Sequence, residues 1–121
     1  MTLFEECLEA LGSYEIVSER ESGAALEALP LTDYGHLDKR ACRSFREVSL
    51  SDMTEMPEIS CYVIWDNAEI PVIRCRLKDA LNCLDDVLAV SFITWLLAED
   101  LSFAAEFHEG EIKLAQLPSN T

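Results

Sequence analysis

The side chains of this chain that could do chemistry are two histidines and several closely spaced carboxylates. His108 follows Glu106 by two residues and precedes Glu109 directly. A histidine flanked by carboxylates can serve as a general base or as a metal ligand. In a strand, however, Glu106 and His108 share one face beside a turn, where polar side chains are usually solvated. We therefore expect a surface pair, and a small metal-dependent hydrolase stays an alternative.

Two adjacent pairs of acids, Asp85-Asp86 and Glu99-Asp100, could in principle hold Mg²⁺ or share acid–base chemistry. Adjacent residues on a helix diverge by about 100°, so Asp85 and Asp86 do not face each other. Glu99 and Asp100 occupy a predicted turn. We expect a solvated acidic face or a docking rim for a basic protein, with no metal and no cofactor.

The remaining sequence carries no motif for nucleotide binding, serine hydrolysis or zinc-dependent proteolysis. The chain has five cysteines and no C-x-x-C pair, which disfavours a zinc ribbon or a thioredoxin-type site. Free thiols of this kind are typical of core positions in a reducing compartment. No secretory signal is visible, and the longest nearly uncharged run, residues 87–98, is too short to cross a bilayer. We expect a cytoplasmic protein.

Length and charge limit the partners. The chain has 121 residues, which we assign to a single domain, residues 1–121, and 23 acidic against 9 basic side chains give a net charge of −14. Such a surface repels nucleic acid and anionic membranes, but it accelerates the encounter with a positive protein. Four of the basic residues are close together, and we expect them to form intramolecular ion pairs: Lys39, Arg40, Arg43 and Arg46.

The first half of the chain predicts mainly helices. A helix is expected over residues 2–11, with Thr2 and Glu5 at capping-box spacing and Gly12 as its stop. A strand is expected over 14–18 and a second helix over 22–29. Residues 30–57 are ambiguous; within them, residues 36–47 fit either a helix or a strand.

The second half has a clearer pattern. Pro71 lies inside one predicted strand, which indicates an edge strand or a bulge. Trp95 falls in a buried run, whereas Trp65 borders a turn and suits core or interface equally. One amphipathic helix, residues 77–88, follows the second of the predicted strands, which cover 60–66, 69–75, 91–98, 101–108 and 111–117. The fold class is therefore α+β, an antiparallel sheet of about five strands with helices packed on it.

The second half of the chain resembles small bacterial immunity proteins. The resemblance is carried by the helix over 77–88, the apolar segment over 90–97 and the closing hairpin around residues 106–112. They resemble above all the immunity proteins of contact-dependent growth inhibition systems, and the resemblance extends over residues 60–117. It implies a cytoplasmic protein that binds one cognate toxin domain, often a nuclease, and blocks it. The matching positions are structural and imply no site residues.

The charge independently favours the same kind of partner, because nucleases are basic. We therefore expect a non-enzymatic immunity protein that occludes a basic toxin domain. The alternative is a nucleic-acid mimic that inhibits many DNA-binding proteins. The expected partner-binding residues are the acids of the predicted turns and of the exposed helix face: Asp66, Glu69, Asp85, Asp86, Glu99, Asp100, Glu109 and Glu111.

Overall fold

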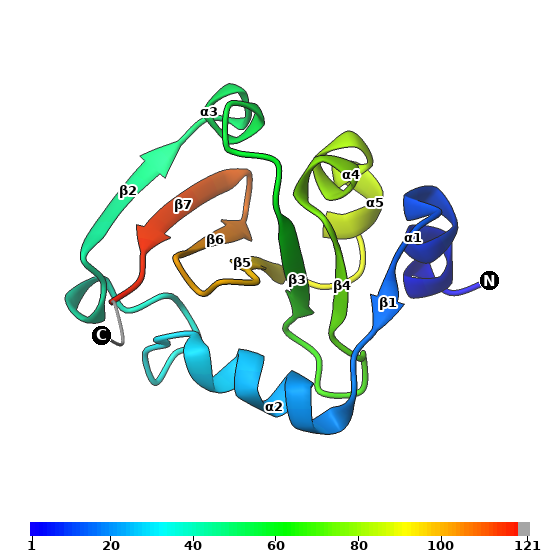
Figure 1. Ribbon diagram of the computed structural model, residues 1–121, viewed down its shortest axis with the longest axis horizontal. Coiled ribbons are helices and arrows are strands. Elements are labelled where there is room, and N and C mark those ends of the chain that lie inside the picture. Colours follow the sequence, from blue (N-terminus) through cyan, green and yellow to red (C-terminus); the bar gives the residue numbers. More distant parts are fainter. Residues whose placement is uncertain (119–121) are drawn as a thin grey trace.

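A computed structural model describes residues 1–118 and contains one antiparallel sheet with helices on both faces (Figure 1). The sheet has seven strands in the order β1-β4-β3-β5-β6-β7-β2. The strands are β1 (Glu15–Ile16), β2 (Ser44–Val48), β3 (Ser60–Trp65), β4 (Ile73–Arg76), β5 (Ile93–Ala98), β6 (Phe103–His108) and β7 (Glu111–Gln116). The α-helices are α1 (Leu3–Leu11), α2 (Glu19–Ala28), α3 (Leu50–Thr54), α4 (Leu77–Asn82) and α5 (Leu84–Leu88), and Lys39–Ala41 forms a 3₁₀ turn.

The side chains of the central strands alternate between two apolar cores. On one face, Val63 and Leu96 pack with residues of α1, α3, α4 and α5. On the other face, Ile64 and Leu97 pack with α2 and the segment that follows it. Figure 1 shows α2 passing along one side of the sheet, with α3, α4 and α5 on the other. Burial on both faces explains why β3 and β5 are apolar without alternation.

Short-range signals account well for the first helix. Thr2 and Glu5 form the predicted capping box, with Thr2 N–H donating to Glu5 Oε1 at 2.9 Å and Glu5 N–H donating to Thr2 Oγ1 at 3.1 Å. Gly12 has a φ of 73°, a conformation that glycine adopts without strain, and it ends α1 as expected. Helix α2 was expected to begin at residue 22 but begins at Glu19, because Ser18 caps it.

The α+β prediction is confirmed, but the sheet has seven strands instead of about five. Both additional strands, β1 and β2, lie at its edges. Strand β1 falls within the segment 14–18 that was expected to be extended, and it pairs with β4. Strand β2 comes from the segment over residues 36–47 that fitted either a helix or a strand. The strand alternative is correct for residues 44–48, which pair with β7 over their whole length.

Pro71 does not lie in a strand, so the prediction of an edge strand or a bulge at this residue is wrong. Strand β4 starts at Ile73 and is internal, between β1 and β3. Because proline has no N–H to donate, the strand can begin only beyond it. Pro71 instead belongs to the connection between β3 and β4.

The helix expected over residues 77–88 is broken at Cys83, whose φ of −127° and ψ of 40° are not helical. The break changes which side chains face the core. Val87 becomes fully buried, whereas Leu84 and Leu88, which belonged to the predicted apolar stripe, stay half-exposed.

Within residues 1–118, no helix has the length and hydropathy that a membrane crossing requires.

Candidate functional site

Sheet topology brings several of the predicted partner-binding acids to one end of the sheet. Strand β3 ends where β5 begins, since Trp65 pairs with Thr94. Strand β6 ends at the same level, with His108 opposite Ile93 and also opposite Glu111, the first residue of β7. The turns that follow β3 and β6 therefore lie at the same edge.

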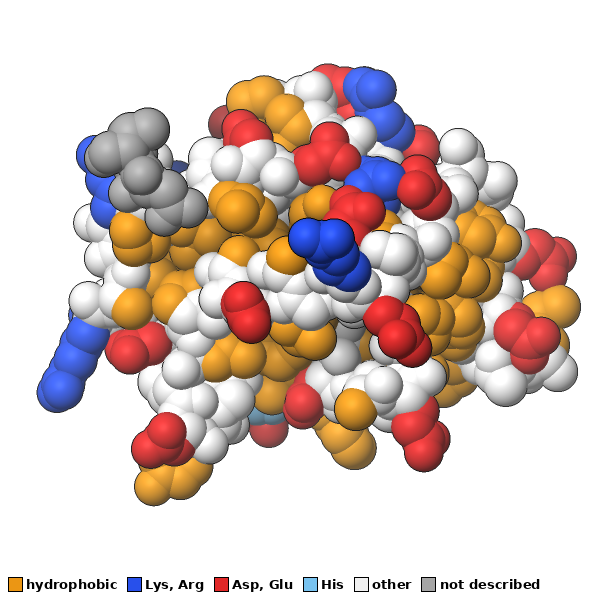
Figure 2. Space-filling view, turned by 60° about the horizontal axis from the view of Figure 1, so that its bottom comes forward, with side chains coloured by type: hydrophobic (Ala, Val, Ile, Leu, Met, Phe, Trp, Pro, Cys, Tyr) orange, Lys and Arg blue, Asp and Glu red, His pale blue; other side chains and the backbone are white. Residues whose placement is uncertain are grey.

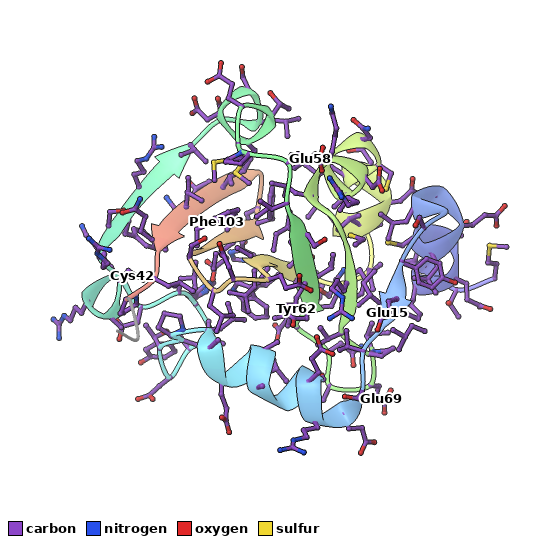
Figure 3. All side chains as sticks on the ribbon, in the orientation of Figure 1. Glu15, Cys42, Glu58, Tyr62, Glu69 and Phe103 are labelled. Carbon is purple, nitrogen blue, oxygen red and sulfur yellow. The ribbon has the colours of Figure 1, made fainter. Side chains whose placement is uncertain are left out.

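The carboxylates at this edge come from three segments. Glu109 lies in the β6–β7 turn, where Glu109 and Gly110 both have positive φ, as the predicted two-residue hairpin requires. Glu69 lies on the loop after β3, at the opposite end of that strand from Glu58 (Figure 3). Helix α5, which carries Asp85 and Asp86, packs on one face of the sheet near this edge, where its Val87 carbonyl accepts from Trp65 Nε1 at the end of β3. We call this set the acidic end: Asp66, Glu69, Asp85, Asp86, Glu109 and Glu111.

All six residues of the acidic end are exposed, and few have a partner within the chain. Glu109 Oε1 lies 3.9 Å from His108 Nε2, and Glu111 Oε2 lies 3.4 Å from Lys113 Nζ. Lys113 also bonds Glu47 Oε1 at 2.9 Å, which makes it a shared cation. In the described part of the chain, the other four acids form no ion pair. Their mutual repulsion would be relieved by a basic partner.

The structure separates Glu99 and Asp100 from these six. They lie in the β5–β6 turn, at the other end of the sheet, where Glu99 N–H donates to the Ser60 carbonyl. Glu99 Oε2 forms an ion pair with Arg74, 3.3 Å from Nε. Asp100 Oδ1 accepts from both the hydroxyl and the N–H of Ser102, and these bonds lower the pKa of its carboxyl. Both side chains are thus engaged within the fold.

Arg74 on β4 joins three elements at the same place. It pairs with Glu15 of β1 at 2.7 Å, with Glu21 of α2 and with Glu99, and its guanidinium lies over the Tyr62 ring. The Tyr62 hydroxyl donates to Glu21 at 2.6 Å, which together with Arg74 lowers the pKa of that carboxyl. This network fixes β1 and α2 to the sheet.

Glu106 is buried, so the expectation of a solvated surface pair with His108 is wrong for this residue. Its oxygens accept from the Leu37 N–H at 2.8 Å, from Trp95 Nε1 at 2.9 Å and from His36 Nδ1 at 3.1 Å. The His36 and His108 rings are 5.1 Å apart. Glu106 therefore holds the segment after α2 onto the sheet, and its acceptor oxygens are occupied.

An apolar groove opens beside the acidic end, between α3, α5 and the β6–β7 hairpin. Its cavity volume is about 310 Å³. We call it the Thr94 groove, because Thr94 lines it and its hydroxyl is buried without a hydrogen-bond partner in residues 1–118. The other lining residues are Leu50, Leu84, Leu88, Phe92, Phe107, His108, Glu109, Gly110, Glu111 and Ile112.

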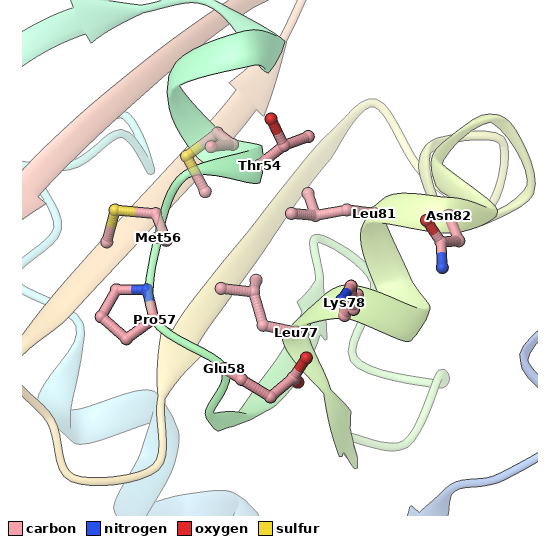
Figure 4. Close-up of a pocket in the computed structure, with 9 residues that line it drawn as sticks. Thr54, Met56, Pro57, Glu58, Leu77, Lys78, Leu81 and Asn82 are labelled. Carbon is pink, nitrogen blue, oxygen red and sulfur yellow. The ribbon is translucent and has the colours of Figure 1, made fainter.

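A second hollow, of about 160 Å³, lies between α3 and α4 (Figure 4). Its walls include Met53, Met56 and Leu77, and its charged lining residues are Glu58 and Lys78. It thus has one charge of each sign, whereas the Thr94 groove has two carboxylates, one histidine and neither Lys nor Arg. Of these two, the Thr94 groove has the polarity that a basic partner would favour. A further cavity of about 460 Å³, between α2 and the loop after β3, has the same polarity, since Glu19, Asp66 and Glu69 line it without Lys or Arg.

The basic cluster does not behave as predicted. Its first two members lie in the 3₁₀ turn, and Arg46 lies on β2, so no helix collects them. Lys39, Arg40, Arg43 and Arg46 are all exposed, and none forms an ion pair with residues 1–118.

Figure 2 shows acidic side chains spread over the α2 side of the molecule with hydrophobic surface between them. The acids are thus not collected in one tail.

The prediction of Trp95 as a core residue is confirmed, and Trp65 is also buried, with Nε1 donating to the Val87 carbonyl at 2.8 Å.

Of the cysteines, Cys7, Cys61 and Cys75 are buried and the other two are half-buried, all as free thiols. Burial raises the pKa of the Cys7 thiol to about 12. Phe92, predicted to be within a buried strand, is 92% exposed. Phe92 lines the Thr94 groove, and no pattern in the sequence predicts that groove.

The CdiI immunity protein family, in its EcoliA0-like form, has a family model that matches residues 1–115. The match extends through the first half of the chain, for which the residues alone suggested no relative. No curated protein matches the chain. Because the family match covers nearly the whole sequence, the chain belongs to the CdiI immunity proteins.

Proposed function

We propose that this immunity protein neutralises a basic toxin domain of the nuclease class, and that it does so by covering the toxin's surface with the acidic end. The observation that supports the proposal most is the group of four exposed carboxylates, Asp66, Glu69, Asp85 and Asp86, that form no ion pair within residues 1–118. A nuclease needs a positive surface to hold phosphates. A negative surface that competes for it associates fast and in a salt-sensitive way.

The mechanism needs no catalytic group on this chain. The carboxylates would replace the phosphates of the substrate, while the apolar side chains around the groove exclude water from the contact. We place this inhibition in the cytoplasm, where free thiols such as the five of this chain persist. A single partner is expected, because apolar shape complementarity adds selectivity to the charge.

The proposal is tested by capture on the immobilised chain at about 50 mM and about 500 mM salt, followed by purification of the captured protein and a nuclease assay. The expected result is one basic partner, inhibited at equimolar ratio, whose association slows on the order of tenfold at the higher salt. Several unrelated DNA-binding proteins would instead support a nucleic-acid mimic. A captured toxin without nuclease activity would contradict the nuclease assignment.

The contact surface is tested separately with a variant that changes all six acids of the acidic end to amides. The matched control changes Glu99 and Asp100 to amides at the opposite end. The proposal expects the first variant to lose toxin affinity and the control to retain it. Equal losses would show that total charge, and not the acidic end, determines binding.

A further inference from the structure

The cavity of about 460 Å³ between α2 and the loop after β3, which we call the α2 cavity, borders the acidic end, because Asp66 and Glu69 belong to its lining. Its volume falls within the roughly 300–1,000 Å³ that is common for ligand pockets. It lies on the face of the sheet that α2 covers and shares no lining residue with the Thr94 groove. The α2 cavity is therefore a separate place at which a partner can insert a side chain.

The walls of the α2 cavity offer accessible aliphatic surface. Leu26 of α2 is 46% exposed, and Leu31 and Ile70 are half-buried. The buried side chains of Ile64 and Trp95 form the floor beneath them. An entering side chain can thus contact apolar surface without displacing the core, and exposed apolar surface of this kind is typical of interaction sites.

The rim of the cavity carries negative charge only. Glu19, Asp66 and Glu69 are exposed, and none of them forms an ion pair within residues 1–118. No Lys or Arg of this range lines the cavity. Figure 2 shows the α2 side of the molecule, where hydrophobic surface lies between acidic side chains. Carboxylates beside apolar surface attract a cation more strongly than carboxylates surrounded by water.

Arg74 shows how this chain neutralises three carboxylates elsewhere. Its guanidinium pairs with Glu15, Glu21 and Glu99 from three elements and lies over the Tyr62 ring. The α2 cavity has three carboxylates from two segments beside apolar surface, but no guanidinium. A guanidinium carries five N–H donors in a planar fork, whereas an ammonium is a point charge with three. The comparison indicates which cation fits the cavity best.

We propose that the α2 cavity receives an arginine side chain of the toxin domain, an inference that rests on the proposed function. The aliphatic stem packs against Leu26, Leu31 and Ile70, and the guanidinium binds the carboxylates of the rim. An apolar side chain would leave the carboxylates without a cation, and an acidic one would be repelled. A lysine would supply the charge but has fewer donors to share among three carboxylates.

The test uses the isolated chain and three probes that share one aliphatic stem and differ in the head group. n-Butylguanidinium represents arginine, n-butylammonium represents lysine, and n-butanol has no charge. Titrations are followed by the methyl chemical shifts of Leu26, Leu31 and Ile70. n-Butylguanidinium should bind about threefold more tightly than n-butylammonium and about tenfold more tightly than n-butanol, and it should shift these methyl signals.

The double variant Asp66→Asn, Glu69→Gln removes two charges from the rim and should weaken n-butylguanidinium binding at least about threefold. The matched control is Glu109→Gln, Glu111→Gln, which makes the same change in net charge at the same end but lines the Thr94 groove instead. The control should lose less than about twofold. All four acids are exposed, so both variants should fold. If one does not, the order of the three probes on the wild-type chain still decides the proposal.

Equal or tighter binding of n-butylammonium would overturn the choice of arginine. Equal losses in the two double variants, or shifts confined to residues outside the α2 cavity, would overturn the site itself. These outcomes are independent of the proposed function, since the probes need no toxin. A chain that binds n-butylguanidinium in this cavity but inhibits no toxin would refute the proposed function and, with it, the toxin as the source of the arginine.

Discussion

The two ends of the sheet carry the same kind of side chain in different states. In the β5–β6 turn, Glu99 forms an ion pair with Arg74, and Asp100 accepts a hydrogen bond from Ser102. At the acidic end, Asp66 and Glu69 are exposed and unpaired within residues 1–118. A carboxylate that has a cation or a hydrogen-bond donor within the chain stabilises the fold. A carboxylate without such a partner repels neighbouring acids and is available to bind a cationic group of another protein. Position in the sheet, more than residue type, therefore separates structural acids from candidate binding acids.

Glu106 is the extreme structural case, and its loss should give the largest effect on stability. Glu106→Ala removes the acceptor of two buried donors, the Leu37 N–H and Trp95 Nε1. We expect a loss of about 3 kcal/mol in the free energy of unfolding, because both donors are left unsatisfied. Urea denaturation measures it.

The control for this prediction is Glu111→Gln, an exposed residue of the acidic end on the neighbouring strand. It should change the free energy of unfolding by less than about 0.5 kcal/mol. Similar effects of Glu106→Ala and Glu111→Gln would remove the distinction between buried structural carboxylates and exposed ones.

Arg74→Met should have an intermediate effect. The methionine keeps apolar contact with the sheet but removes the cation shared by Glu15, Glu21 and Glu99. Arg74 retains 21% of its side-chain exposure, so solvent screens these pairs, and we expect a loss of about 1.5 kcal/mol. The same denaturation experiment applies. An Arg74→Met protein as stable as wild type would show that the network contributes nothing to the fold.

The smallest effect concerns pH and two capping boxes, the one formed by Thr2 and Glu5 at the start of α1 and a second one formed by Ser49 and Asp52 at the start of α3. Backbone hydrogen bonds from Thr2 and Ser49 lower the pKa of Glu5 and Asp52, respectively. A carboxyl whose pKa is lower in the folded state stabilises the fold at neutral pH, and this contribution is lost as the pH falls through that value.

Thermal unfolding of wild type and of the double variant Glu5→Gln, Asp52→Asn tests this dependence. The wild type should be the more stable protein at pH 7, and the difference should shrink as the pH falls below about 4, where carboxyls become protonated. A difference that is the same at both pH values would contradict the role of the two ionised carboxylates.

The parts of the fold that the sequence predicted are those set by local signals. The capping box at Thr2, the hairpin at Glu109-Gly110 and the buried strand β5 each depend on a few adjacent residues. Strand β2 was ambiguous because it is a polar edge strand, whose pairing with β7 gives little apolar alternation. The break at Cys83 was missed because the apolar periodicity continues across it.

The candidate site was predictable only in part for the same reason. That Asp66 and Glu109 follow strands is visible in the sequence, but their common edge depends on the long-range pairing of β3 with β5 and β5 with β6. Glu99 has the same local pattern and lies at the other end, beside Arg74. The Thr94 groove requires α3, α5 and a hairpin to meet, which no local pattern encodes.

The central claim is that the acidic end neutralises the toxin, and a competition between the two ends tests it most directly. The toxin domain captured by the wild-type chain is titrated with wild type, with the six-amide variant of the acidic end and with the Glu99→Gln, Asp100→Asn control, each shown to be folded. We predict an affinity loss of about 30-fold or more for the six-amide variant, equal to about 2 kcal/mol, and less than about threefold for the control. Full neutralisation by the six-amide variant at wild-type concentration would contradict the claim.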